Sequence, residues 1–259
     1  MMSEELRAAI LGCIQGITEF FPISSSAHLI VFRDALGFEG AGLPFDISVH
    51  LATLLAVLIY FRREILEVLT GPEAVPVILR VGLATLPSVA IGLALKSHRD
   101  ELSRWFVVGG WTLSGTYLLF TRGLDGALRY SRLPLSRALL VGMAQAMAIF
   151  PGISRSGSSI SAGLWLGLDR TQAARFSFLL AIPAILGAAV LTGLDILESP
   201  QEQERLWKAA SIAMPVAFVT GMVAIHFLLR IVRGDRFHLF GIYNLTAAAI
   251  FAAYLVLAG

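Results

Sequence analysis

Residues 15–28 read QGITEFFPISSSAH, and residues 151–159 read PGISRSGSS. Both are breaks inside longer apolar stretches, which run from about 6 to 36 and from about 137 to 167. Each stretch is too long for one membrane span and too short for two, because a helix needs roughly 20 residues to cross the bilayer core. An arm of about 15 residues reaches only about 22 Å at 1.5 Å per residue. The two stretches therefore predict re-entrant helical hairpins, whose non-helical turns must be buried in protein or line a wet cavity.

The composition of the whole chain is that of a membrane protein. Of its 259 residues, 56% are hydrophobic and 15% are charged, and the mean hydropathy is +0.76. A soluble domain carries about 25% charged residues, so this chain lacks the charge to cover a soluble surface. The net charge of +2 gives no reason to expect a nucleic-acid partner, and we expect none.

Six further apolar segments are each long enough to cross a bilayer. They span approximately 44–61, 75–95, 104–121, 172–193, 209–229 and 238–258. The sequence thus predicts an all-α integral membrane protein with six transmembrane helices and two re-entrant helical hairpins. We expect a single membrane domain over residues 1–259, with the lipid bilayer around it and the question of a homodimer left open.

The two breaks are copies of each other at one constant spacing along the chain, here called the repeat offset. The identical pairs that define it are Gly12/Gly142, Gln15/Gln145, Phe20/Phe150, Ile23/Ile153, Ser24/Ser154 and Ser26/Ser156. The order of segments agrees, because a hairpin and three spans occur twice, in repeat 1 (about 1–125) and repeat 2 (about 126–259). A repeat with an odd number of spans is inserted upside down in its second copy, and inverted repeats bring their broken helices together near the midplane. We therefore expect an inverted-topology repeat in which the two breaks meet.

The loop from 122 to 137 orients the chain in the membrane. It carries four arginines, at 122, 129, 132 and 137. Because cytoplasmic loops are enriched in Lys and Arg, this loop is expected on the cytoplasmic side. Both termini and the mouth of the first hairpin are then expected outside.

Residues capable of chemistry stand at both breaks. Glu19 ends the first arm, deep in apolar sequence, where an ionised carboxylate is costly unless it is paired. Gln15 lies one helical turn earlier on the same face. Ser25 and His28, three residues apart, are expected to share one face of the next helix. With Arg155 in the second break, the pattern predicts that an acid, an imidazole, a hydroxyl and a guanidinium converge.

Each break also precedes a helix whose N-terminus points into the membrane interior, where free N–H groups suit an anion. Arg155 can bind a phosphate through two parallel hydrogen bonds. Ser25 is then a candidate nucleophile, with His28 or Glu19 as its base. Alternatively, Glu19 holds a divalent cation, Mg²⁺ or Ca²⁺, that neutralises the phosphates; no organic cofactor is expected. Further hydroxyl donors are Ser24, Ser26, Ser154, Ser156, Ser158 and Ser159.

The two motifs closely resemble the signature motifs of the bacterial undecaprenyl-diphosphate phosphatase family, also called the bacitracin-resistance phosphatases. The resemblance covers essentially the whole chain. The family removes one phosphate from undecaprenyl diphosphate on the outer side of the cytoplasmic membrane, which recycles the lipid carrier of cell-wall synthesis. The resemblance therefore implies a hydrolase in the bacterial inner membrane that acts on a polyprenyl diphosphate.

The resemblance also implies roles for single residues. By motif position, the family's acidic pair falls on Gln15 and Glu19, its proposed nucleophile on Ser25 and its essential histidine on His28. Glutamine at the first acidic position resembles an accepted family alternative. It weakens any metal site that needs two carboxylates.

The family's phosphate-binding group falls on Ser154, Arg155 and Ser159 in the second motif. Ser159 replaces the usual threonine, which keeps the hydroxyl and removes only a methyl group. The second motif therefore resembles an intact phosphate-binding segment.

Other interpretations remain open. A lipid transporter or flippase for polyprenyl phosphates could use the same midplane site, since secondary transporters also have inverted repeats with broken helices. A degenerate homologue could bind the lipid without hydrolysing it. Glu19 and Arg155 could form a purely structural ion pair, and His28 could be a packing residue. We expect interfacial or packing roles for His50, His98, His226 and His238, and helix caps at Asp46 and Asp169.

Overall fold

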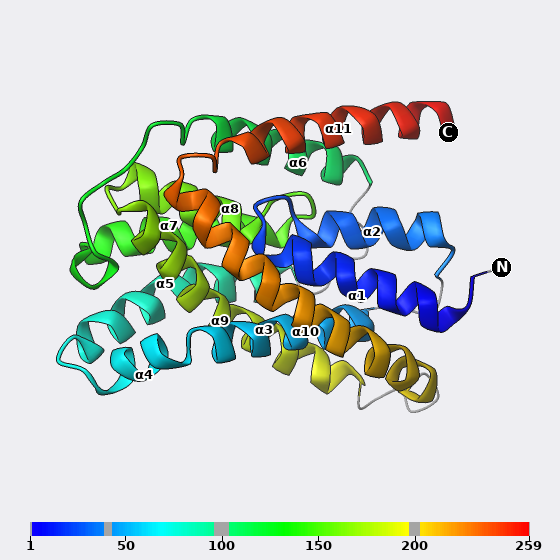
Figure 1. Cartoon of the computed structure of the whole chain (residues 1–259), viewed down its shortest axis with the longest axis horizontal. Helices are drawn as coiled ribbons and strands as arrows, with labels where there is room; N and C mark the ends of the chain where they lie inside the picture. The colour runs from blue at the N-terminus through cyan, green and yellow to red at the C-terminus, as the bar shows by residue number, and fades with distance from the viewer. Residues whose placement is uncertain (1, 39–42, 96–103, 197–202, 259) are drawn as a thin grey trace.

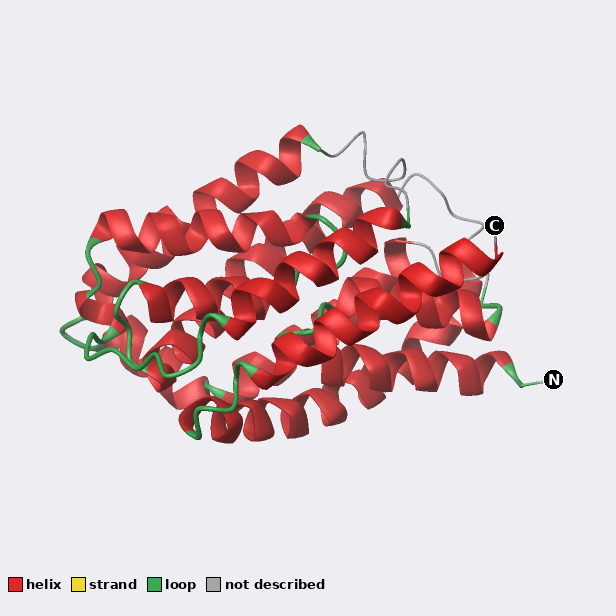
Figure 2. Cartoon of the chain, turned by 90° about the horizontal axis from the view of Figure 1, so that it is seen from above, coloured by secondary structure: helices red, strands yellow, loops and turns green. Residues whose placement is uncertain are grey.

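The computed structural model of the protein describes residues 2–38, 43–95, 104–196 and 203–258, which are almost entirely helical (Figure 2). The elements in chain order are α1 (Glu4–Phe20), α2 (Ser25–Leu36), α3 (Leu43–Tyr60), α4 (Arg62–Thr70), α5 (Ala74–Ala94), α6 (Trp105–Leu119), η2 (Tyr130–Arg132), α7 (Leu135–Ala146), η3 (Met147–Ile149), α8 (Arg155–Trp165), α9 (Arg170–Ile196), α10 (Gln203–Arg233) and α11 (Leu239–Ala258). Within the described ranges, extended backbone pairs only at an isolated bridge between Leu128 and Leu168. The predicted all-α class is confirmed.

Several of these helices can cross a membrane. Among the described residues, four are long and apolar enough, namely all of α5 and parts of α9, α10 and α11, and a fifth candidate joins α3 to α4 across a 70° bend. The predicted multi-pass membrane class is therefore confirmed. The predicted spans coincide with α3, α5, α6, α9, α10 and α11, but α6 has only 15 residues, so six spans remain a prediction. Asp169 caps α9 as predicted, because its side chain accepts a hydrogen bond from Gln172 N at 2.7 Å.

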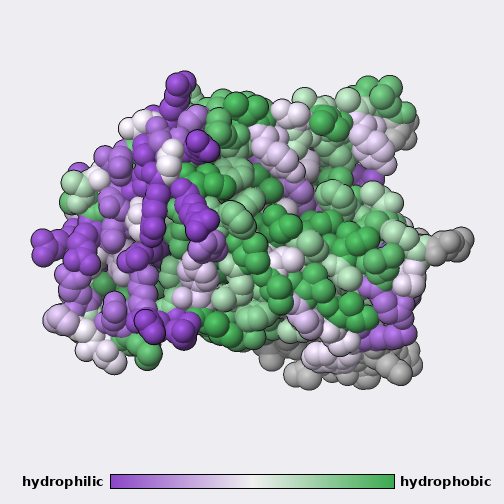
Figure 3. Space-filling model, viewed as in Figure 1, coloured by the Kyte–Doolittle hydropathy of each residue, from purple (hydrophilic) through white to green (hydrophobic). Residues whose placement is uncertain are grey.

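The helices lie along the long axis of the molecule, with both termini at one end (Figure 1). At the opposite end lie α4 and the loop between α6 and α7. Hydrophilic side chains gather at that second end, and apolar side chains cover the middle of the visible face (Figure 3). Exposed arginines of that end include Arg62, Arg63, Arg122, Arg129 and Arg132. The charge asymmetry expected from the sequence is thus present in three dimensions.

Each broken stretch folds as a helical hairpin whose mouth is closed by an arginine. In the hairpin of α1 and α2, Arg7 Nη1 donates to Gly37 O at 2.8 Å. In the hairpin of α7 and α8, Arg137 Nη1 donates to Leu166 O at 3.1 Å. The first mouth lies at the end with the termini and the second at the arginine-rich end, so the hairpins enter from opposite ends (Figure 1).

The helices around the hairpins make equivalent contacts at the repeat offset. Asn244 Nδ2 of α11 donates to Pro22 O in the first break at 2.8 Å, and Ser114 Oγ of α6 donates to Gly152 O in the second at 3.1 Å. Likewise α1 packs along α10 and α7 along α5. In both packed pairs a glycine, Gly12 or Gly142, lies directly against the facing backbone, where a Cβ would collide. These contacts fix the two breaks in the middle of the bundle.

Candidate active site

Proline follows the first arm of each hairpin, and the chain turns there before the next helix begins. Pro22 follows α1, and Pro151 follows η3 by two residues. In the first break, Ser24 has φ 67° and ψ 98°, a conformation that favours glycine and stores about 1–3 kcal/mol of strain. In the second break Gly152 takes the positive φ, 93°, and Ser154 caps α8 by accepting a hydrogen bond from the N–H three residues later at 3.1 Å. Strained backbone of this kind clusters at functional sites.

Glu19 is the centre of the site. Its side chain is buried between the two breaks, with 7% of the residue exposed. Arg155 Nη2 donates to Glu19 Oε1 at 2.7 Å. Ser25 Oγ donates to Glu19 Oε2 at 2.7 Å, and Gln15 Nε2 donates to the same oxygen at 3.0 Å. The prediction that the breaks meet is confirmed, because residues 136 positions apart in sequence form a buried ion pair.

The cluster opens into a cavity of about 570 Å³. The predicted site residues that line it are Glu19, Ser24, Ser25, Ser26, Ser154 and Arg155. Gln15, Ser156 and Ser159 are not among its lining residues. Ser156 Oγ instead donates to Phe21 O in the other break at 3.3 Å, and Ser159 Oγ lies 2.7 Å from Ser177 Oγ of α9. These three residues hold the cavity walls in place and do not face its interior.

The cavity suits an anion. The helices α2 and α8 both begin at residues that line it, Ser25 and Arg155, so two helix N-termini with free N–H groups meet there. Arg155 keeps donors for a ligand, since its second nitrogen, Nη1, makes only a long 3.5 Å contact with Ser177 O. At the other wall Arg33 pairs with Asp46, which lies inside the first turn of α3. The prediction that Asp46 caps a helix is therefore wrong, because the helix begins before it. The lining therefore offers cationic and N–H donors around one central carboxylate.

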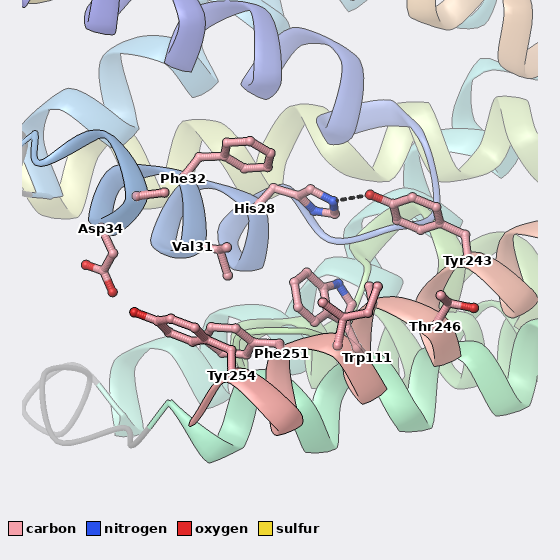
Figure 4. Close-up of a pocket in the computed structure, with 12 residues that line it drawn as sticks. His28, Val31, Phe32, Asp34, Trp111, Tyr243, Thr246, Phe251 and Tyr254 are labelled. Carbon is pink, nitrogen blue, oxygen red and sulfur yellow. Dashed lines mark hydrogen bonds between the residues drawn. The ribbon is translucent and has the colours of Figure 1, made fainter. Parts of the chain in front are cut away.

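His28 does not line this cavity, although we predicted that it shares a face with Ser25. Its Nε2 lies 2.7 Å from Tyr243 OH and its Nδ1 2.8 Å from Ser24 O. It lines a separate apolar cavity of about 500 Å³ with Trp111 and Tyr243 (Figure 4). The reason is geometric, because residues three apart on a helix point about 60° apart. Because other helices pack on both sides of α2, this angle is enough to place Ser25 in the polar cavity and His28 in the apolar one.

His50 of α3 is the histidine that reaches the cluster, and sequence reasoning missed it. Its Nε2 lies 3.4 Å from Glu19 Oε2, and its Nδ1 lies 2.6 Å from Asp46 O. A carbonyl oxygen only accepts, so Nδ1 carries a proton and Nε2 is the atom that can exchange one with Glu19. The signal was present in the sequence, since an ionisable residue inside an apolar segment is a functional candidate by default.

The remaining histidines give no second site. His226 is exposed, with Nδ1 3.3 Å from Tyr60 OH, and His238 is half-buried. Both positions agree with the packing or interfacial role expected for them. His98 lies outside the described residues.

The donor set around Glu19 was tested against the predicted divalent cation. Its carboxylate is already in contact with the Arg155 guanidinium and the His50 imidazole, and the acidic position one turn earlier is the amide of Gln15. In the described part of the chain, no three His, Cys, Asp or Glu side chains form a group that could hold a metal ion. This arrangement does not fit a metal held by the protein alone, and the divalent cation stays a prediction.

Comparison with known proteins gives a consistent result. The family described as bacitracin resistance protein BacA matches residues 8–250. A protein of Rhodopirellula baltica named undecaprenyl-diphosphatase is 42% identical, covering 96% of this chain and 97% of the relative. Proteins of the same name from Desulfosudis oleivorans and Alcanivorax borkumensis are each 40% identical, covering 93% and 92% of this chain and 94% of each relative. The chain therefore belongs to the BacA bacitracin resistance family.

Proposed function

We propose that this chain is an integral membrane phosphatase that hydrolyses undecaprenyl diphosphate to undecaprenyl phosphate and inorganic phosphate. The observation that carries the proposal is the 2.7 Å hydrogen bond from Ser25 Oγ to Glu19 Oε2, beside the Arg155 guanidinium. A hydroxyl that donates to a buried carboxylate is a nucleophile next to its base. The adjacent cation suits the phosphate under attack. The relatives from three bacteria carry the name of this activity.

In the first step Ser25 Oγ attacks the terminal phosphorus while Glu19 takes the hydroxyl proton. The bond between that phosphorus and the bridging oxygen breaks. The products are a phosphoserine and the lipid monophosphate, which leaves with the bridging oxygen. Arg155 and the N–H groups at the starts of α2 and α8 stabilise the charge on the transferred phosphoryl group.

In the second step water attacks the phosphoserine and releases inorganic phosphate, which restores the Ser25 hydroxyl. Glu19 first passes the proton it took from Ser25 to the cavity through His50 Nε2, which lies 3.4 Å from Glu19 Oε2. Glu19 then takes a proton from the attacking water and returns it to Ser25 Oγ as the bond from that oxygen to phosphorus breaks. His28, bonded to Ser24 O, positions the strained first turn of α2 from which Ser25 projects.

The proposed fold is an inverted repeat of residues 1–125 and 126–259, with six transmembrane helices and two re-entrant hairpins. The equivalent contacts at the repeat offset support it, as do two hairpin mouths at opposite ends. The polar cavity extends to Arg33 near the end of α2 and Asp46 near the start of α3, on the side of the termini. With the arginine-rich end placed in the cytoplasm, that side is outside. The site then faces the outer side of the bacterial cytoplasmic membrane.

An enzyme and a transporter are separated by one measurement. Purified protein in detergent, without any gradient, is expected to release inorganic phosphate from a polyprenyl diphosphate. A flippase would bind the lipid and release none. The enzyme is favoured because the two copies of the break differ, with Glu19 aligned to Ile149 and Ser25 aligned to Arg155 at the repeat offset. A carrier that works symmetrically would not need different residues at the equivalent positions of the two breaks.

The two histidines are expected to respond differently to substitution. His50→Ala should lower kcat by about tenfold or more, because a charge-assisted contact is worth about 1.5–3 kcal/mol, and should alter the pH–rate profile. His28→Ala should also lower kcat, by loosening the first turn of α2, but should leave the shape of the pH–rate profile unchanged. Phosphate release measured across pH for both variants checks this. A changed profile in His28→Ala with a normal one in His50→Ala would reverse the two roles.

A further inference from the structure

A third cavity, of about 490 Å³, adjoins the polar one at Arg155. It shares wall residues of η3 and α9 with the polar cavity, including Ile149 and Ala184. This third cavity, here called the tail groove, continues between α5 and α9, and its rim carries exposed apolar side chains, such as Leu93 and Val190. Since α5 and α9 are both candidate membrane spans, the tail groove connects the polar cluster with the lipid-facing surface.

The tail groove is hollow because small residues stand where the other repeat has large ones. At the repeat offset the aligned pairs are Ser88/Phe218, Gly92/Met222, Ala184/Leu54, Gly187/Val57 and Ala188/Leu58. Val57 and Leu54 are buried, and Phe218 and Met222 pack against the main core. The equivalent place in the first repeat is therefore filled with side chains. Larger side chains are accommodated at the equivalent positions of repeat 1, so the small residues of repeat 2 indicate that the cavity is used.

Gln145 gives an independent indication of a ligand. It lines the tail groove, only 2% of it is exposed, and neither of its amide atoms has a hydrogen-bond partner within the described chain. Its counterpart Gln15 donates to Glu19, whereas the residue opposite Gln145 at the same spacing is Ile149. Ser88 Oγ in the same wall is also without a partner among the described residues. Buried unpaired polar groups are costly, so their presence points to a partner supplied by a ligand.

We propose that the tail groove binds the lipid half of a polyprenyl diphosphate. This inference rests on the proposed phosphatase function and assigns its second subsite. The terminal phosphate lies at Ser25 and Arg155, and the phosphate that stays with the lipid receives hydrogen bonds from Gln145 Nε2 and Ser88 Oγ. The first isoprene units then lie between α5 and α9, against Gly92 and Gly187.

The size of the tail groove limits what it can recognise. From Ser88 to Gly92 the wall extends about 6 Å along α5, and from Ala184 to Val190 about 9 Å along α9, at 1.5 Å per residue. It therefore holds only the start of a polyprenyl chain, and the rest lies in the bilayer. The tail groove selects for the presence of an isoprenoid chain and not for its full length.

The experiment fills the tail groove without disturbing the packing. A Cβ at Gly92 meets only Ile149 Cδ1, at 4.0 Å, and a Cβ at Gly187 meets nothing within 4 Å. Gly92→Leu and Gly187→Leu should each raise KM for farnesyl diphosphate by at least about tenfold, because each methylene kept out of the tail groove weakens binding about fourfold. KM for methyl diphosphate, which has the same head and no isoprene unit, should stay unchanged. The control is Gly82→Leu on the exposed face of α5, where a Cβ also meets nothing within 4 Å and no effect is expected.

The outcomes separate the tail groove from the proposed function. Suppose that the natural chain turns over farnesyl diphosphate and that KM is unchanged in Gly92→Leu and Gly187→Leu. That result overturns the proposed lipid site in the tail groove but leaves the proposed phosphatase function in place. No turnover by the natural chain overturns the phosphatase. In that case the tail groove is tested by the binding of a methylene-bridged farnesyl diphosphate analogue. Equal affinity of the natural chain, Gly92→Leu, Gly187→Leu and Gly82→Leu for this analogue would overturn the proposal that the tail groove binds the lipid.

Gln145→Leu provides a second readout that a structural role would not give. Replacing two unpaired polar atoms by methyl groups should raise the melting temperature, by about 2–4 °C. The same change should lower kcat/KM for farnesyl diphosphate by about tenfold, the effect of one lost hydrogen bond to a charged group. A lower melting temperature together with unchanged kcat/KM would show that Gln145 serves packing and would remove it from the subsite.

Discussion

Ser25→Ala is expected to lower phosphate release from a polyprenyl diphosphate by at least about a hundredfold, which is about 2.7 kcal/mol in activation free energy. The hydroxyl is the atom that forms the new bond to phosphorus, and alanine has nothing to put in its place. Because Ser25 Oγ donates to Glu19 and is only partly buried, its removal leaves the ion pair of Glu19 with Arg155 in place. The loss should therefore appear in kcat while the fold and lipid binding persist.

The matched control is Ser211→Ala on α10, whose exposed hydroxyl donates to a carbonyl of its own helix, Lys208 O, at 2.8 Å. It should turn over at the normal rate. A direct check is acid quenching during turnover, followed by mass spectrometry of the peptide that contains Ser25, which should carry a phosphoryl group. Normal turnover by Ser25→Ala would remove the serine as nucleophile, and a phosphoryl group found on a histidine after an alkaline quench, which preserves the acid-labile phosphohistidine, would identify the replacement.

The second large effect concerns the ion pair between Glu19 and Arg155. Glu19→Ala should destabilise the protein by at most about 3–5 kcal/mol, because it leaves a partly buried guanidinium without its counter-ion. Arg155→Ala should do the same for the carboxylate. The double variant, which removes both charges, should recover much of the lost stability. All three variants should lack phosphatase activity, since both groups act in the reaction. The double variant should therefore regain stability without regaining activity.

Thermal unfolding in detergent and phosphate release on the same preparations measure the two effects. The control pair is Glu5 and Lys208, which lie 2.9 Å apart at the surface. Because water and salt screen such a pair, its single and double alanine variants should unfold and turn over as the natural chain does. Recovery of turnover together with stability in the Glu19→Ala/Arg155→Ala variant would make the ion pair purely structural.

Much of this architecture could be predicted, because the relevant constraints act along the chain. The length of an apolar stretch relative to a bilayer identified the two hairpins, and the repeat offset indicated that their breaks meet. The contact of Glu19 with Arg155 follows from these two observations. Neither of these two observations depends on knowing which helices pack against each other.

The features that were missed depend on contacts between distant segments. His28 and His50 could not be ranked from sequence, because helical spacing tells which residues share a face but not what covers that face. In the structure Tyr243 of α11 engages His28, while α3 brings His50 to Glu19. In the same way the identity of Gln15 and Gln145 was visible, but the missing partner of Gln145 was not.

The closure of the active site by two hairpins has a consequence for biosynthesis. Glu19 leaves the ribosome well over a hundred positions ahead of Arg155, so the first hairpin is inserted long before its counter-ion exists. Until the second hairpin packs against the first, the carboxylate must stay protonated or in contact with water, since an unpaired charge in hydrocarbon is costly. Chains that end before Arg155 therefore lack a residue that the proposed reaction needs, and they are expected to be inactive. The ion pair that completes the active site also locks together the two halves of the chain, so catalytic competence and completed membrane assembly arise in the same event.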